Sequence, residues 1–221
     1  MDPQDLRWTY AHVRLQFPEL DKFTGNKLQQ FYADIVTQHR FEIFVQDGDS
    51  GADLETEGRR SLQIRRSSIF LDETVSDTVE VVSKNWTHLL DVTQTTFGIP
   101  LFMVNRVTIR ALWPTNEEDL TEKLRTRLIS LTDDELDVLG NVQGVSVTFA
   151  GHTGEDPDDL PHYDWSVEIA PHLQEPSEIW LELENRPFPP IAENAEEVVK
   201  TLQQTYSLLT DNVTKFVKQL M

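Results

Sequence analysis

The chain has 221 residues, and a hydrophobic content of 38% is enough for one large domain or two small ones with cores of their own. Its 38 acidic residues against 19 basic ones give a formal charge of -19, which disfavours nucleic acid and anionic lipid as partners. The absence of cysteine excludes disulfides and thiolate sites. No stretch approaches the roughly 20 apolar residues of a membrane helix, and the segment MDPQDLRWTY lacks the features of an export signal. We therefore expect a cytoplasmic protein without a membrane partner.

Alternation and helical spacing predict the first elements of the chain. Residues 9–17 alternate between apolar and polar side chains, which is typical of a half-buried strand. Apolar residues from Leu28 to Val36 recur at helical spacing, so a helix should follow the turn at 23–26 and end near His39.

A second strand and an acidic loop come next. In residues 40–46, Phe41, Ile43 and Val45 alternate with polar or aromatic neighbours and should continue the buried face. The segment DGDSGADLETEG at 47–58 is rich in aspartate, glutamate and glycine, which predicts a solvated loop.

The rest of the first half is predicted as a hairpin and a helix. The apolar positions change parity between Ile64 and Ile69, which indicates a tight reversal rather than one long strand. An apolar stripe from Val79 to Leu90 then predicts a helix that ends near Gly98.

The second half follows the same order of elements. We predict a central strand at 101–113, a capped helix after Thr115, strands at 145–150 and 163–169 around an acidic loop at 151–162, a strand at 179–184, a proline-rich connector at 186–191 and a final helix. The predicted fold class is α+β: two similar strand-helix-three-strand-helix units, at 1–97 and 98–221, with mainly antiparallel sheets and a long C-terminal amphipathic helix. We expect the two units to pack as one globular domain.

The final helix carries a regular apolar seam with alternating spacings of four and three residues. Its members are Ala195, Val199, Leu202, Tyr206, Leu209, Val213, Phe216 and Leu220. Such a seam favours a coiled-coil dimer that uses Leu209, Val213 and Phe216. The other interpretation is an ordinary stripe that packs on the chain's own sheet, because Val198 and Val217 widen it.

One segment contains candidate metal ligands. Within residues 152–164, His152, Asp156, His162 and Asp164 supply the imidazoles and carboxylates that zinc, manganese or iron can bind. The same composition is typical of a solvated turn, and the spacing matches no helical metal motif. A metal-dependent hydrolase with a divalent metal at this segment is the alternative function.

Two arginines of the predicted central strand share a face. Arg106 and Arg110 could bind an anion, or they could form ion pairs with carboxylates of the next strand, for example Glu168 or Glu182. The sequence contains neither a nucleophile motif of a hydrolase nor a phosphate-binding glycine loop. No cofactor is therefore predicted for the leading hypothesis.

That hypothesis rests on aromatic residues outside the predicted core face. Trp8, Tyr10 and Trp180 lie opposite the core residues of their predicted strands, so another helix or a partner must cover them. We predict a non-enzymatic protein-interaction or accessory protein that binds another protein or a second copy of itself through an apolar patch rimmed by acidic loops. A homo-oligomer is expected.

Several segments also resemble a known family. The hairpin SLQIRRSSIFLDE, the strand MVNRVTI with Asn105 and Arg106, and the hairpin WSVEIAPHLQEPSEIWLELE before a closing amphipathic helix are similar to a sporadically distributed family of uncharacterised bacterial proteins. The resemblance covers almost the whole chain. It implies this α+β architecture and a bacterial cytoplasmic setting, and it implies no catalytic residue.

Overall fold

The structure is a computed structural model, and it describes residues 5–20, 23–75, 77–115, 120–124, 126–127, 145–154, 161–172, 174–175 and 177–220. The strands are β1 Arg7–Gln16, β2 Ile43–Asp47, β3 Gly51–Thr56, β4 Arg60–Arg65, β5 Ser68–Thr74, β6 Phe102–Pro114, β7 Val147–His152, β8 His162–Pro171, β9 Glu178–Phe188 and β10 Ile191–Ala192. The helices are α1 Gly25–His39, α2 Val79–Phe97, α3 Leu120–Leu124, α5 Ala195–Ser207 and α6 Thr214–Leu220, with a π-helical turn at Leu208–Val213 between α5 and α6.

The described strands form one antiparallel sheet that spans both halves of the chain. Its order is β2-β3-β4-β5-β1-β6-β9-β8-β7, with the short β10 added beside the beginning of β6. Strands β1 and β6 pair at the centre, where the first half of the chain meets the second. The predicted α+β class with an antiparallel sheet and a long C-terminal helix is confirmed.

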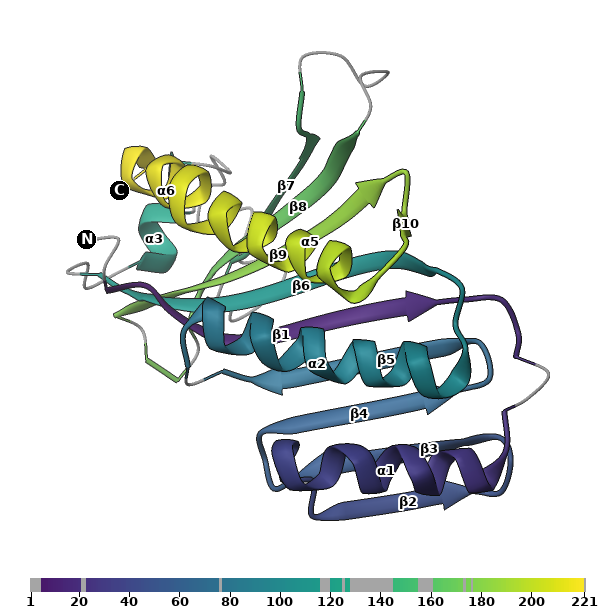
Figure 1. The fold of residues 1–221 in the computed structure, drawn as a ribbon. Helices are drawn as coiled ribbons and strands as arrows, with labels where there is room; N and C mark the ends of the chain where they lie inside the picture. Colours follow the sequence, from purple (N-terminus) through teal and green to yellow (C-terminus); the bar gives the residue numbers. More distant parts are fainter. Residues whose placement is uncertain are drawn as a thin grey trace, which may run out of the picture.

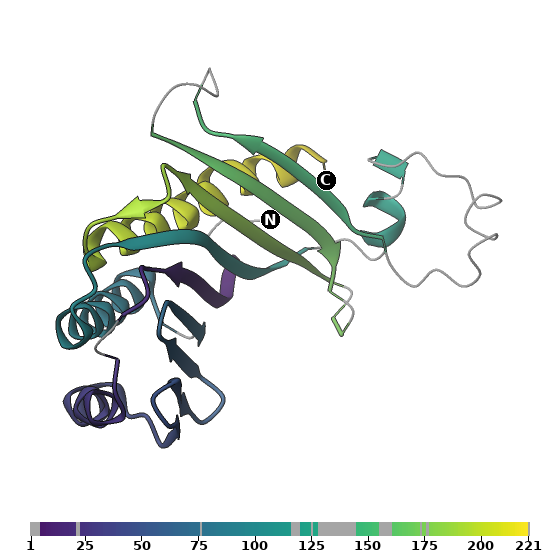
Figure 2. The same ribbon diagram turned by 90° about the vertical axis from the view of Figure 1, so that its right-hand side faces the viewer.

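Helices α1, α2, α5 and α6 all lie on one face of this sheet (Figures 1 and 2). We call the opposite face, which carries none of these four helices, the bare face. The core lies between the sheet and the helices, and its largest fully buried side chains include Trp86, Trp113, Phe31 and Phe102. Antiparallel sheets tolerate such one-sided cover because their strands alternate between apolar and polar side chains.

Local sequence signals account for the helix ends. The side chain of Thr24 accepts a hydrogen bond from the backbone amide of Lys27 and caps α1. Asn194 caps α5 in the same way, by accepting from the amide of Glu197 at 3.0 Å. Helix α2 ends at Gly98, whose positive φ of 69° favours glycine.

Two β-bulges between β1 and β6 decide which side chains reach each face. The register shifts between Trp8 and Tyr10, and again between Arg14 and Leu15. A bulge adds one residue to one strand, so the strand turns its following side chains to the other face. Trp8 therefore belongs to the helix side, whereas Tyr10 points to the bare face.

The prediction that residues 47–58 form an acidic loop is wrong for most of this segment. Residues Gly51–Thr56 form strand β3, in which Ala52 and Leu54 are buried beneath the helices. Asp53 and Glu55 alternate with them and occupy the bare face.

The buried face predicted for the second strand is also wrong. Phe41 is buried, but it precedes β2, and Arg40 before it has a positive φ of 54°. In β2 itself, Phe44 stacks on Tyr32 of α1 with ring centroids 4.5 Å apart. Ile43 and Val45 consequently lie on the bare face and are exposed.

The strand order of the two halves runs outward from the centre as β1-β5-β4-β3-β2 and β6-β9-β8-β7. That the halves repeat one unit stays a prediction, because most of the chain between β6 and β7 lies outside the described residues. Among the described helices, none is long and apolar enough to cross a membrane.

Candidate functional site

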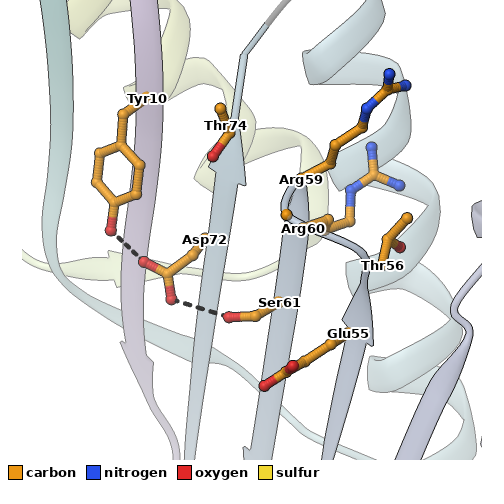
Figure 3. A pocket seen from close by; sticks show the side chains of 9 residues that line it. Tyr10, Glu55, Thr56, Arg59, Arg60, Ser61, Asp72 and Thr74 are labelled. Atoms are coloured by element: carbon orange, nitrogen blue, oxygen red, sulfur yellow. Dashed lines mark hydrogen bonds between the residues drawn. The ribbon is translucent and has the colours of Figure 1, made fainter.

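A polar network crosses the centre of the bare face. Asp72 of β5 accepts hydrogen bonds from the Tyr10 hydroxyl of β1 and from Nδ1 of His12, which lies 2.8 Å from Oδ1. The Ser61 hydroxyl of β4 donates to the other carboxylate oxygen at 3.4 Å (Figure 3). The sheet register explains this convergence, because Ser61 and His12 are the direct neighbours of Asp72 on either side.

The environment shifts the pKa values of two members of this network. Burial alone would raise the pKa of Asp72, but hydrogen bonds from His12 and Tyr10, the charge of His12 and the Ser61 hydroxyl hold it below its usual value. Burial raises the pKa of Tyr10, and the hydrogen bond to Asp72 raises it further. Tyr10 therefore keeps its proton and Asp72 stays ionised.

Two arginine–glutamate pairs adjoin the network. Arg106 donates to Glu184 at 2.6 Å, and Arg110 donates to Glu182 at 2.5 Å. The Arg110 guanidinium also lies over the Tyr10 ring, 4.6 Å from its centroid. Both sequence-predicted arginines thus lie together on the bare face, each with a carboxylate of β9 as its partner.

The hydrogen-bond order of the network differs from that of a hydrolase triad. In a triad the serine hydroxyl bonds to the histidine, whereas here Ser61 and His12 both bond to Asp72. A cavity of about 290 Å³ lies beside Tyr10 and Asp72, with Arg59 on its rim (Figure 3). The network therefore presents charged and hydrogen-bonding side chains to a ligand on an open surface.

The candidate metal ligands come together only in part. His152 ends β7 and His162 begins β8, with ring centroids 6.3 Å apart. Oδ1 of Asp164 lies 3.5 Å from Nε2 of His162. Asp156 lies outside the described residues, and within the described part of the chain no three histidine or acidic side chains form a group that could hold a metal ion.

The candidate partner-binding residues are divided between the two faces. Trp8 is buried and meets Tyr206 of α5 edge to face, at a centroid distance of 5.2 Å. Tyr10 and Trp180 are half-buried on the bare face. In the C-terminal helix, Leu209 and Val213 are buried in the chain's own core and Phe216 is half-buried.

Exposed apolar residues of the described chain lie at two places on the bare face, on the edge strand β2 and on the neighbouring strands β6, β9 and β10. The exposed large hydrophobic residues of the described chain are Ile43, Val45, Val81, Met103, Phe188 and Ile191. The register places all of them except Val81 of α2 on the bare face. We call Met103, Phe188 and Ile191 the apolar patch; it lies near the beginning of β6, next to the strand end that leads into the acidic segment after His152.

The sequence alone did not identify Asp72, His12 or Ser61 as a group, nor the apolar patch. His12 and Asp72 are 60 residues apart in the sequence, and only the pairing of β1 with β5 brings them together. The polar alternation of residues 9–17 was the one available signal, because it placed Tyr10 and His12 on the same face.

Replacing Asp72 with alanine should lower the free energy of unfolding by about 1–2 kcal/mol, because three donors lose their acceptor in a half-buried site. The Tyr10→Phe variant is the matched control. It removes one donor from a carboxylate that keeps two others, so we expect a loss below about 1 kcal/mol. Urea unfolding measures both, and equal losses would show that Asp72 does not organise the network.

No model of a known protein family matches the chain, and a search of the curated proteins finds no match either.

Proposed function

We propose that the protein is a non-enzymatic interaction protein of the cytoplasm, and that it binds a second copy of its own chain through the bare face of the sheet. The observation that carries this proposal is the apolar patch of Met103, Phe188 and Ile191, which are all exposed on that face. Isolated exposed hydrophobic residues are ordinary, but a group on one uncovered face is typical of a protein-binding surface.

The polar residues of the bare face support the same conclusion. Every cation that the described strands project on it is an arginine, namely Arg7, Arg14, Arg65, Arg106, Arg110 and Arg186. Every lysine that the structure describes lies in a helix instead. Protein interfaces are enriched in arginine, methionine and aromatic residues and are depleted in lysine.

Charge favours a second copy as the partner. Against those six arginines the described strands project nine carboxylates, namely Asp47, Asp53, Glu55, Asp72, Asp164, Glu168, Glu178, Glu182 and Glu184. These strands therefore carry an excess of three negative charges on the bare face. The whole chain has a formal charge of -19. Two copies therefore repel each other least when their bare faces meet.

Sedimentation velocity over a range of concentrations tests this proposal. The wild-type protein should show a concentration-dependent dimer, and Phe188→Glu or Ile191→Glu should raise its dissociation constant at least tenfold by placing a carboxylate in the apolar patch. Val81→Glu is the matched control, because Val81 is also exposed but lies on the helical side. It should leave the dimer unchanged.

Two results would contradict the proposal. The first is a wild-type protein that stays monomeric at every concentration. The second is a dimer that Val81→Glu weakens while the variants of the apolar patch do not, which would move the interface to the helices.

A further inference from the structure

A second surface feature lies on the other side of the sheet and is independent of the proposed dimer. Strands β7 and β8 and the C-terminal helix line a half-open cavity of about 500 Å³. Pockets for small molecules commonly have about 300–1,000 Å³ and mainly apolar walls. The walls here are formed by Phe149, Trp165, Val167, Val213 and Phe216.

The described lining of the cavity is uncharged, although the protein is strongly acidic. None of its described lining residues is aspartate, glutamate, lysine or arginine. Its described polar groups are few: Asn212 and His152 are exposed, and the Thr153 hydroxyl accepts a hydrogen bond from the backbone amide of Tyr163 at 2.9 Å. Such a lining gives a charged ligand no counter-charge and favours a neutral one.

The π-helical turn shapes one wall of this cavity. In it the backbone amide of Thr214 donates to the carbonyl of Leu209, five residues earlier instead of four. The extra residue rotates the helix that follows, so Val217 takes the fully buried position and Phe216 is left half-buried at the cavity. Single π-helical turns are rare, and they occur frequently at functional sites.

The opposite wall depends on a glycine. A Cβ atom added to Gly151 of β7 would lie 2.8 Å from Cζ2 of Trp165 on β8, closer than real Cβ contacts. The missing side chain therefore lets the indole lie against β7 as part of the wall. Phe149 and Phe216 are in direct edge-to-face contact in the lining, with ring centroids 4.9 Å apart.

We propose that this cavity is a binding site for a small, uncharged aromatic molecule. The ligand lies among the rings of Trp165, Phe149 and Phe216, and the Asn212 amide hydrogen-bonds its polar group. The volume admits a molecule of about two or three fused or linked rings. Aromatic walls select flat ligands because rings gain from stacked and edge-to-face contacts beyond the burial of their area.

Fluorescence titration with N-phenyl-1-naphthylamine, a neutral probe with fused and linked rings, tests the site. The wild-type protein should bind one probe molecule in a saturable manner. Val213→Phe and Leu208→Trp enlarge a lining side chain and should each weaken binding at least tenfold. Leu208 is half-buried, so the second variant keeps the test valid if Val213→Phe fails to fold. Circular dichroism checks the fold of each.

The control is Val81→Trp, which adds an indole to an exposed position of α2 outside the cavity. It should bind the probe as the wild type does. Absence of saturable binding to the wild-type protein would overturn the proposal, as would binding that both cavity variants retain in full. The oligomeric state plays no part in this readout, so its outcome and that of the dimer test are distinguishable.

Discussion

Replacing Glu73 with alanine is expected to lower the free energy of unfolding by about 3–5 kcal/mol, a range typical of breaking a buried ion pair. Glu73 accepts from Arg60 at 2.5 Å and from the indole nitrogen of Trp86 at 2.8 Å. The Arg60 and Glu73 side chains are only 11% and 7% exposed. The substitution thus leaves a buried guanidinium without its counter-charge and a buried indole N–H without an acceptor. Urea unfolding at neutral pH measures the loss.

Two further variants separate the ion pair from general damage to the core. The double variant Arg60→Met, Glu73→Leu removes both charges, so it should recover most of the stability that the single variant loses. Glu184→Ala breaks the more exposed pair with Arg106 and should cost less than about 1 kcal/mol. A single-variant loss as small as that of Glu184→Ala would show that Arg60 finds another partner or reaches water.

Local patterns predicted the elements whose periodicity is uninterrupted. The hairpin around Arg65 to Ser68 and helix α2 were both found where parity and spacing placed them. Strand β3 was missed because its acidic composition outweighed the alternation of Ala52 and Leu54 with Asp53 and Glu55. Composition is a weak signal in a sheet with one solvated face, where every second residue of a strand is free to be charged.

Face assignments failed wherever the backbone departs from a regular repeat. Because of the bulge after Trp8, the Trp8 side chain lies in the core, although simple alternation places it on the same face of the sheet as Tyr10. The π-helical turn similarly exchanged Phe216 for Val217 in the core, although the seam of four and three residues favoured Phe216. One inserted residue shifts the phase of the pattern, and the shift cannot be recognised where only a few residues lie on one side of it, as with Trp8 and Phe216 near the ends of their elements.

The candidate site depends on strand pairing, which single segments do not specify. The polar face of β1 was visible in the sequence, but its contact with Asp72 needs the order β4-β5-β1-β6. The sequence predicts Glu182 of the following hairpin as a candidate partner for the arginines, and Glu182 pairs with Arg110. It does not predict that Glu184 pairs with Arg106. Cross-strand pairs become predictable only after the register is known.

Acid should destabilise the protein through His39 before it affects the carboxylates. Burial, the positive charge of Arg60 and the neighbouring His88 lower the pKa of His39 from 6.5 to about 4. Nδ1 of His39 lies 3.3 Å from the Arg60 guanidinium, which can only donate, so Nδ1 must accept. Nε2 then donates to Nδ1 of His88 at 2.8 Å. The folded protein therefore holds His39 in its neutral form.

The sign of the pH effect follows from this lowered pKa. The unfolded chain takes up the proton near pH 6.5 and the folded chain only near pH 4, so the contribution of His39 is complete above pH 6.5 and is lost as the pH falls towards 4. At pH 5 the expected loss is about 2 kcal/mol relative to pH 7.5. The pKa of Asp72 lies below its usual value of 3.8, so its loss begins at a lower pH.

Urea unfolding of the wild-type protein and of His39→Gln at pH 7.5 and pH 5 measures this effect. Glutamine can accept from Arg60 and donate to His88 as the neutral imidazole does, but it does not titrate. The variant should therefore be nearly independent of pH in this window, and the difference between the two proteins isolates His39 from His88, Glu73 and other groups near it. Equal losses at pH 5 would place the acid sensitivity elsewhere.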